Sequence, residues 1–229
     1  VSGAVFSAPL RVACVGDSIT SGYALKNPAR DAFPAQLQRI LGDGYEVRNF
    51  GNSGRGIYLD TMRGKEKRGY RWMNEHAEAV AWRPDVVICN LGINDYGAFA
   101  KELSGERRRG QFVDEYLLLL GDYAKAEPRP KFYIWTKLGP LASKHKGYGN
   151  PGPAKMSGDL EKVARSAHAA GIDMHTPLLR VIDSSFEVDG IHPDAAGARL
   201  IAQVTFGELA KDRVENGDKA VEKSGEVGK

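Results

Sequence analysis

The sequence has 229 residues, of which 42% are hydrophobic and 27% are charged. This composition is typical of a soluble globular protein with a single domain of ordinary size. The formal net charge of +3 is small for this length, so it gives no reason to expect nucleic acid or an anionic membrane as a partner. The longest apolar runs, Val86–Leu91 and Leu117–Leu120, are too short to span a bilayer.

The chain contains two cysteines, Cys14 and Cys89, and each lies in a run that we predict to be a buried strand. Because free cysteine is among the most buried residue types, we expect two core thiols rather than a disulfide. The chain begins at Val1, and its small, weakly apolar opening Val1–Pro9 is compatible with the remainder of a signal peptide. We therefore expect a secreted or periplasmic bacterial protein, with a cytoplasmic one as the alternative.

Short apolar runs alternate with amphipathic segments in the first half of the chain. The predicted elements are a strand at Arg11–Val15, a helix at Ala32–Leu41, a strand at Tyr45–Phe50, a helix at Asn74–Trp82 and a strand at Asp85–Leu91. In the first helix the spacing places Phe33, Leu37, Ile40 and Leu41 on one face. The last strand is almost continuously apolar, which is typical of a strand buried on both faces of a parallel sheet.

The same rhythm continues in the second half. Its predicted elements are a helix at Phe112–Lys125, a strand at Lys131–Trp135, a helix at Gly158–Ala170, a strand at Gly171–His175 and a helix at Ala195–Lys211. Strands that alternate with helices predict βαβ units and a parallel sheet covered on both faces. We expect one α/β domain at residues 1–213 and a disordered, charged tail over Val214–Lys229.

Four polar segments follow predicted strands or precede the last helix. They are Gly16–Thr20, Asn49–Gly54, Gly92–Asp95 and Asp189–Pro193. In an open α/β sheet, ligands bind outside the carboxyl ends of the strands. We therefore expect these four segments to meet in one site.

The residue types in these segments fit acyl transfer. Ser18 is the candidate nucleophile, and a serine hydroxyl needs a neighbouring base to take its proton. His192 is the candidate base, because it alone among the five histidines lies in a short Gly/Pro-flanked loop with a carboxylate three residues away. That carboxylate, Asp189, can hold the imidazole in the required tautomer.

A tetrahedral intermediate also requires preorganised donors for its negatively charged oxygen. The candidates are the backbone N–H groups of Ser18 and Gly54 and the side-chain amide of Asn94. Glycine at position 54 would let the backbone approach a substrate closely.

The four segments resemble the motif blocks of the SGNH (GDSL-type) esterase and lipase superfamily. Gly-Asp-Ser-Ile-Thr resembles its nucleophile block, Asn-Phe-Gly-Asn-Ser-Gly its oxyanion-glycine block, Gly-Ile-Asn-Asp its asparagine block and Asp-Gly-Ile-His-Pro its acid–base block. The resemblance runs from about Arg11 to Phe206. It implies a flavodoxin-like, three-layer α/β/α sandwich with no metal and no cofactor. It also implies the roles given above for the nucleophile, the base, the acid and the oxyanion donors (Ser18, His192, Asp189, Gly54 and Asn94). The sequence departs from common family patterns at Arg55-Gly56, where a small residue followed by Thr is frequent.

Other interpretations remain for individual residues. Ser18 alone could be a helix N-cap, and Asp17 and Asp95 are better interpreted as local hydrogen-bonding supports than as catalytic acids. The remaining histidines (His76, His145, His168 and His175) show no metal-ligand spacing. The segment Gly51–Gly56 does not fit a nucleotide-binding glycine motif. We interpret Arg107–Arg109 as a solvated turn, and the charge-rich Asp60–Arg71 as an insertion or lid-like loop near the site. A non-catalytic carbohydrate-binding protein and a nucleotide- or flavin-binding module are the rivals from other classes.

The substrate is the least determined part of the prediction. The candidate substrate contacts are Asp17, Arg55, Tyr58, Tyr96, Lys137 and Tyr148. Aromatic and hydrogen-bonding groups suit a polar sugar with a small acyl group better than a lipid, which needs an extended apolar groove. We therefore expect a carbohydrate O-acetylesterase, with a lipase or lysophospholipase, a thioesterase or an arylesterase of the same superfamily as alternatives. The oligomeric state is left open.

Overall fold

A parallel sheet of five strands forms the middle of the described structure. The computed structural model describes residues 8–57, 69–95, 106–138, 154–186 and 189–225. The strands are β1 (Leu10–Gly16), β2 (Tyr45–Gly51), β3 (Val86–Asn90), β4 (Lys131–Lys137) and β5 (Ala170–Asp173). Their order in the sheet is β2-β1-β3-β4-β5, and every neighbouring pair is parallel.

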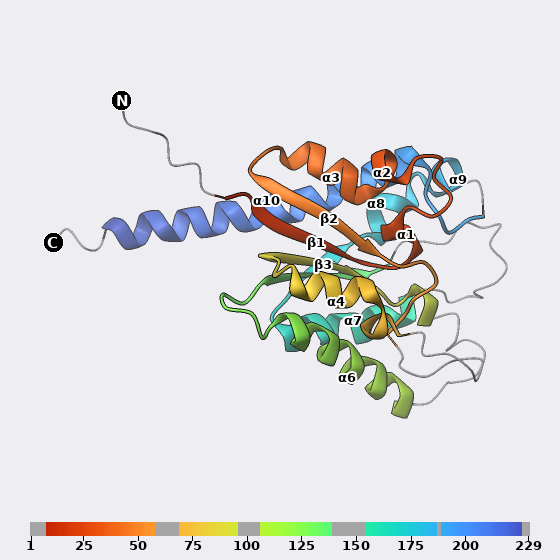
Figure 1. Cartoon of the computed structure of the whole chain (residues 1–229), viewed down its shortest axis with the longest axis horizontal. Helices are drawn as coiled ribbons and strands as arrows, with labels where there is room; N and C mark the ends of the chain where they lie inside the picture. The colour runs from red at the N-terminus through yellow and green to blue at the C-terminus, as the bar shows by residue number, and fades with distance from the viewer. Residues whose placement is uncertain (1–7, 58–68, 96–105, 139–153, 187–188, 226–229) are drawn as a thin grey trace.

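Helices cover both faces of this sheet (Figure 1). The helices are α1 (Ser18–Ser21), α2 (Pro28–Asp31), α3 (Phe33–Leu41), α4 (Asn74–Ala81), α6 (Glu106–Tyr123), α7 (Ala154–Ala167), α8 (His175–Leu179), α9 (Ile182–Ser185) and α10 (Ala195–Gly225), with a 3₁₀ turn η1 at Tyr70–Trp72. In Figure 1, α3 and α10 lie together on one side of the sheet, while α4, α6 and α7 lie on the other. The predicted three-layer α/β sandwich is thereby confirmed.

The register of the sheet determines where the site can form. Gly16, the last residue of β1, pairs with Gly51 at the end of β2 and with Asn90 at the end of β3. The carboxyl ends of these three strands are therefore level, and the polar segments that follow them are brought together at one edge. The start of β1 and the end of α10 lie toward the opposite end of the domain (Figure 1).

The central strands carry the core. Val12, Ala13, Cys14 and Val15 of β1 are fully buried, as expected for a strand with neighbours on both sides and helices on both faces. Cys14 and Cys89 are both buried and free, which confirms the prediction of two core thiols. Burial raises the pKa of the Cys89 thiol to about 12 and raises that of Cys14 as well, so both remain neutral thiols.

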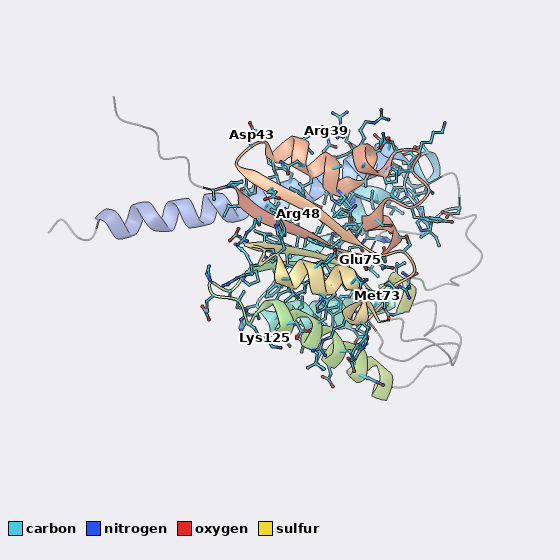
Figure 2. The ribbon with its side chains drawn as sticks, in the orientation of Figure 1. Arg39, Asp43, Arg48, Met73, Glu75 and Lys125 are labelled. Atoms are coloured by element: carbon cyan, nitrogen blue, oxygen red, sulfur yellow. The ribbon has the colours of Figure 1, made fainter. Side chains whose placement is uncertain are left out.

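β2 is an edge strand, and its outward side chains are charged. Arg48 pairs with Glu46 at 2.7 Å, and its guanidinium lies 4.5 Å from the centroid of the Trp82 ring. Figure 2 shows Arg48 on this outer surface, along with Arg39 and Glu75 on the adjoining helices. Charged side chains on an edge strand disfavour pairing with the strand of another molecule.

Three local predictions about helices and strands were wrong. Ile40 of α3 is 37% exposed, whereas Phe33 and Leu37 are buried, because Ile40 falls at the margin of the apolar stripe. Arg107–Arg109 belong to the backbone of helix α6 rather than to a turn, since α6 begins at Glu106. The strand expected at Gly171–His175 ends at Asp173, and His175 starts α8.

The last helix is longer than expected. α10 continues to Gly225 instead of ending near Lys211. This stretch contains Glu, Lys and Ala, which are good helix formers, and it lacks proline. In Figure 1 its end projects beyond the sheet. No helix in the described ranges is both long enough and apolar enough to cross a membrane.

Candidate active site

Ser18 lies at a sharp turn from strand to helix. It is the first residue of α1 and comes two residues after the last residue of β1. Asp17 is the N-cap of this helix, and its Oδ1 accepts the backbone N–H of Ile19 at 2.9 Å. Gly22 ends the helix with a left-handed φ of +81°, which a glycine adopts without strain. The Ser18 hydroxyl is thus placed at the carboxyl edge of the sheet, where 8% of the residue is exposed.

Ser18, His192 and Asp189 form one hydrogen-bonded chain. Ser18 Oγ lies 2.8 Å from His192 Nε2, although the two residues are 174 positions apart. His192 Nδ1 lies 2.5 Å from Asp189 Oδ2. Because an ionised Asp189 can only accept, Nδ1 carries the imidazole proton and Nε2 is left to accept from the serine hydroxyl.

The charge on Asp189 is maintained by its surroundings. Its Oδ1 accepts the backbone N–H groups of Ile191 and His192, each at 2.9 Å. Burial alone would raise the pKa of Asp189, but these donors and the His192 ring outweigh it and lower the pKa. The carboxylate is therefore ionised at neutral pH, as a group that orients an imidazole requires.

The loop that carries His192 is fixed by neighbouring helices. The backbone N–H of Asp194 donates to Ser185 O in α9 at 2.8 Å, and Asp194 Oδ1 caps α10 by accepting from Gly197 N at 2.8 Å. From α3, the buried Gln36 amide donates to Ala195 O at 2.9 Å. These contacts hold His192 against Ser18 from three elements.

The predicted oxyanion donors lie in two loops that are tied together. Asn94 Nδ2 donates to the backbone carbonyl of Arg55 at 2.8 Å, and a primary amide has a second N–H that this bond leaves over. Gly54 has a left-handed φ of +75° and is exposed. Within the described residues, the backbone N–H groups of Ser18 and Gly54 have no acceptor. Ser21 Oγ lies 2.9 Å from Ser53 Oγ and joins the Gly54 loop to α1.

Comparison with known proteins identifies the family of this chain. The model of the GDSL-like lipase/acylhydrolase family matches residues 14–200. The chain belongs to this family of hydrolases. An acetylxylan esterase of Xylanibacter ruminicola is 33% identical over 213 residues, which cover 85% of this chain and 42% of that protein. The chain therefore spans less than half the length of this curated relative.

Solved structures share the fold of this GDSL-like hydrolase. A carbohydrate acetylesterase from Sinorhizobium meliloti superposes with a TM-score of 0.64 at 21% identity, covering 88% of this chain and 99% of that one. A lipase/acylhydrolase from Enterococcus faecalis superposes with a TM-score of 0.65 at 17% identity, covering 87% and 95%. At these identities the likeness establishes the α/β fold alone.

Two buried carboxylates, Asp17 and Asp95, are the chain neighbours of Ser18 and Asn94. Asp95 accepts the backbone N–H of Ile57 with both oxygens at 2.9 Å, and the Gly56 backbone comes so close that a Cβ there would lie 2.6 Å from that carboxylate. This contact explains why the chain has glycine at position 56. Asp17 is fully buried, and burial together with the nearby charge of Asp95 raises the pKa of Asp17 to about 7. Asp17 has no exposed surface in this structure, which disfavours its predicted role as a substrate contact.

Of the other predicted substrate contacts, the structure describes Arg55 and Lys137. Arg55 lies in the Gly54 loop, where its Nε donates to Asn52 Oδ1 at 3.0 Å. Lys137, at the end of β4, pairs with Asp173 of β5 at 2.8 Å, and this pair raises the pKa of Lys137. Tyr58, Tyr96, Tyr148 and most of the expected lid-like loop at 60–71 lie outside the described residues.

Tyr23 was missed by the sequence analysis. Its ring centroid lies 4.7 Å from that of His192, with 58° between the ring planes, and the residue is 57% exposed. The sequence feature that could have indicated Tyr23 is its place directly after Gly22, five positions from Ser18.

The described histidines and carboxylates outside this site form no metal centre. In the ranges covered by the structure, no three His, Cys, Asp or Glu side chains are grouped so that they could hold a metal ion. His76 instead bridges two helices, with Nε2 at 3.2 Å from Asp122 Oδ2 and Nδ1 at 3.2 Å from the Tyr123 hydroxyl. Burial lowers the pKa of His76, which makes it a neutral structural side chain.

Proposed function

We propose that this chain is a carbohydrate O-acetylesterase that works through a Ser18–His192–Asp189 triad. The observation that carries the proposal is the continuous contact from Ser18 Oγ through the His192 ring to Asp189, at 2.8 Å and 2.5 Å. A serine hydroxyl becomes a useful nucleophile when a correctly oriented base accepts its proton during attack.

The first half of the reaction forms an acyl-enzyme. Ser18 Oγ attacks the ester carbonyl carbon while His192 Nε2 takes the hydroxyl proton, and the imidazolium is stabilised by Asp189. The negative charge on the former carbonyl oxygen is stabilised by the N–H groups of Ser18 and Gly54 and by the Asn94 amide. The C–O bond to the sugar then breaks as His192 gives its proton to the departing sugar oxygen.

The second half repeats this chemistry with water. His192 takes a proton from a water molecule, whose oxygen attacks the acyl carbon bound to Ser18. Collapse of the second tetrahedral intermediate returns the proton to Ser18 Oγ and releases the carboxylic acid. These reaction steps use no protein group beyond the three side chains of the triad and the oxyanion donors.

The choice of an acetylated sugar is supported by relatives and by local chemistry. The relative with 33% identity is an acetylxylan esterase, and one of the fold neighbours is a carbohydrate acetylesterase. Arg55 follows Gly54 and its backbone carbonyl accepts from the Asn94 amide, while the exposed aromatic Tyr23 lies against the His192 ring. Such groups suit a hydroxyl-rich leaving group better than a long acyl chain.

Hydrolysis of p-nitrophenyl acetate beside p-nitrophenyl octanoate tests the proposal, with the wild type and Ser18→Ala compared. We expect the wild type to prefer the acetate ester and the Ser18→Ala variant to lose turnover. In a second assay, we expect the wild type to release acetate from acetylated xylan. Turnover that survives in Ser18→Ala would refute the triad. A preference for octanoate would instead indicate a lipase or thioesterase, and no release of acetate from any ester would indicate a binding protein.

A further inference from the structure

An exposed aromatic ring lies against the proposed base. The ring of Tyr23 is centred 4.7 Å from that of His192, and 57% of Tyr23 is exposed. Within the described part of the chain, the Tyr23 hydroxyl has no hydrogen-bond partner. A tyrosine that only filled the core would be buried and would have its hydroxyl satisfied.

The backbone fixes Tyr23 to the turn that carries Ser18. The Tyr23 N–H donates to the Ser18 carbonyl at 2.9 Å, so the two residues belong to one hydrogen-bonded unit. The flanking residues Gly22 and Ala24 both have left-handed φ values, +81° and +71°. Ala24 has a Cβ and is disfavoured in this conformation. Strained backbone of this kind persists where the surrounding structure requires it.

In the proposed mechanism the leaving group lies close to this ring. Ser18 is 8% exposed and the His192 side chain 13% exposed, so the reacting atoms are open to solvent over a small area. In the mechanism above, the leaving oxygen takes its proton from His192 Nε2. A leaving group of any size therefore lies next to the imidazole, and Tyr23 lies on that imidazole.

A pyranose ring fits such a neighbour. Its C–H groups form an apolar face that is attracted to the electron-rich face of an aromatic ring, and its hydroxyl groups can pair with the phenol hydroxyl of Tyr23. We propose that Tyr23 is a specificity-determining residue that binds the sugar ring of the leaving group. This inference rests on the proposed acetylesterase function and adds to it a recognition element for the alcohol side of the ester.

Two substrates that share the acetyl group separate this role from general catalysis. Methyl tri-O-acetyl-β-xylopyranoside has a pyranose leaving group, and ethyl acetate has no ring. Tyr23→Ala removes the ring, Tyr23→Trp keeps an aromatic surface, and Tyr23→Phe removes the hydroxyl alone. Phe206→Ala is the matched control, because Phe206 is an aromatic residue with 37% exposure in α10, about 16 Å along the helix from its start.

We expect Tyr23→Ala to lower kcat/KM for the sugar ester roughly 3- to 10-fold, through KM, while kcat/KM for ethyl acetate stays within about twofold of wild type. Tyr23→Trp should restore the sugar ester, and Phe206→Ala should match wild type on both substrates. The pH profile on ethyl acetate should be the same in all variants.

Three results would overturn the inference. An unchanged kcat/KM of Tyr23→Ala on the sugar ester means that the ring does not bind the sugar. Equal losses on both substrates, with a shifted pH profile, mean that Tyr23 acts only by positioning His192. A wild-type protein that hydrolyses ethyl acetate but no sugar ester refutes the proposed function itself, so that failure is distinguishable from the other two.

Discussion

The side-chain amide of Asn94 donates a 2.8 Å hydrogen bond to the backbone carbonyl of Arg55. This bond joins the segment after β3 to the segment after β2, which carries Gly54. One amide hydrogen of Asn94 is used to hold the loop, and the second is left for a substrate oxygen. A single side chain thus combines a structural contact with the proposed oxyanion contact.

Asn94→Ala should lower kcat on p-nitrophenyl acetate roughly 10²- to 10³-fold, because one oxyanion donor is lost. Ser53→Ala is the matched control, since it removes the Ser21–Ser53 contact from the same loop without removing a donor. Steady-state kinetics measure kcat of both variants, and kcat of Ser53→Ala should fall less than about tenfold. Equal losses in the two variants would mean that Asn94 acts only by holding the loop.

Asp189→Asn should lower kcat roughly 10³- to 10⁴-fold, by analogy with the effect of this substitution in serine proteases. The amide can still accept from the loop N–H groups, but its NH₂ would face His192 Nδ1 and favour the wrong tautomer. Asp194→Asn, in the same loop, keeps an effective N-cap for α10 and should retain near-wild-type kcat. Stopped assays with p-nitrophenyl acetate measure both. A mild effect of Asp189→Asn would argue against its orienting role.

The stability of the protein should depend on the protonation of Asp17. Burial, with a contribution from the charge of Asp95, raises the pKa of Asp17 from 3.8 to about 7 in the folded state. Between these two pH values the folded protein holds a proton that the unfolded chain has released. The contribution of Asp17 to the stability of the folded protein therefore falls as pH rises through this window, by at most about 1.4 kcal/mol per pH unit, and this loss is complete above about pH 7.

Asp17→Asn does not titrate and keeps an oxygen that can accept from Ile19 N. Its free energy of unfolding relative to wild type should therefore increase between pH 5 and pH 7, as measured by urea denaturation. Asp43→Asn, at an exposed position (Figure 2), controls for the loss of a surface carboxylate. A difference between Asp17→Asn and wild type that is constant over this pH range would show that Asp17 is ionised throughout.

Gly51→Ala should disturb the nucleophile through packing. A Cβ at position 51 would lie 2.2 Å from the backbone nitrogen of Ser21, in the helix that begins with Ser18. We expect a loss of about 1–3 kcal/mol of stability and a roughly 10- to 100-fold lower kcat. Gly44→Ala, directly before the same strand, meets no atom within 4 Å and should change neither quantity greatly. Thermal unfolding and steady-state assays test the pair, and wild-type behaviour of Gly51→Ala would contradict this packing.

Much of the site is encoded locally and could be predicted from the sequence. The order of strands and helices follows from runs of apolar residues and their period, which depend on neighbouring residues alone. Asp189 and His192 are three residues apart, so one short loop already places the acid beside the base. Ser18 comes two residues after the end of a strand, and that position at the carboxyl edge of a sheet indicated Ser18 as the proposed nucleophile.

Other features depend on contacts between distant segments. Whether Asp17 touches solvent is decided by how β1, β3 and the loop at Asp95 pack around it, and no local pattern distinguishes a buried cap from a substrate contact. The position of Tyr23 on His192 depends on two left-handed residues and on a loop 169 positions away along the chain. The sequence by itself determined the fold class and the family blocks and indicated the proposed acid–base pair, because these depend on short-range order. Only the tertiary structure decided which side chains border the reacting atoms, because burial and long-range contacts are set by the packing of the whole domain.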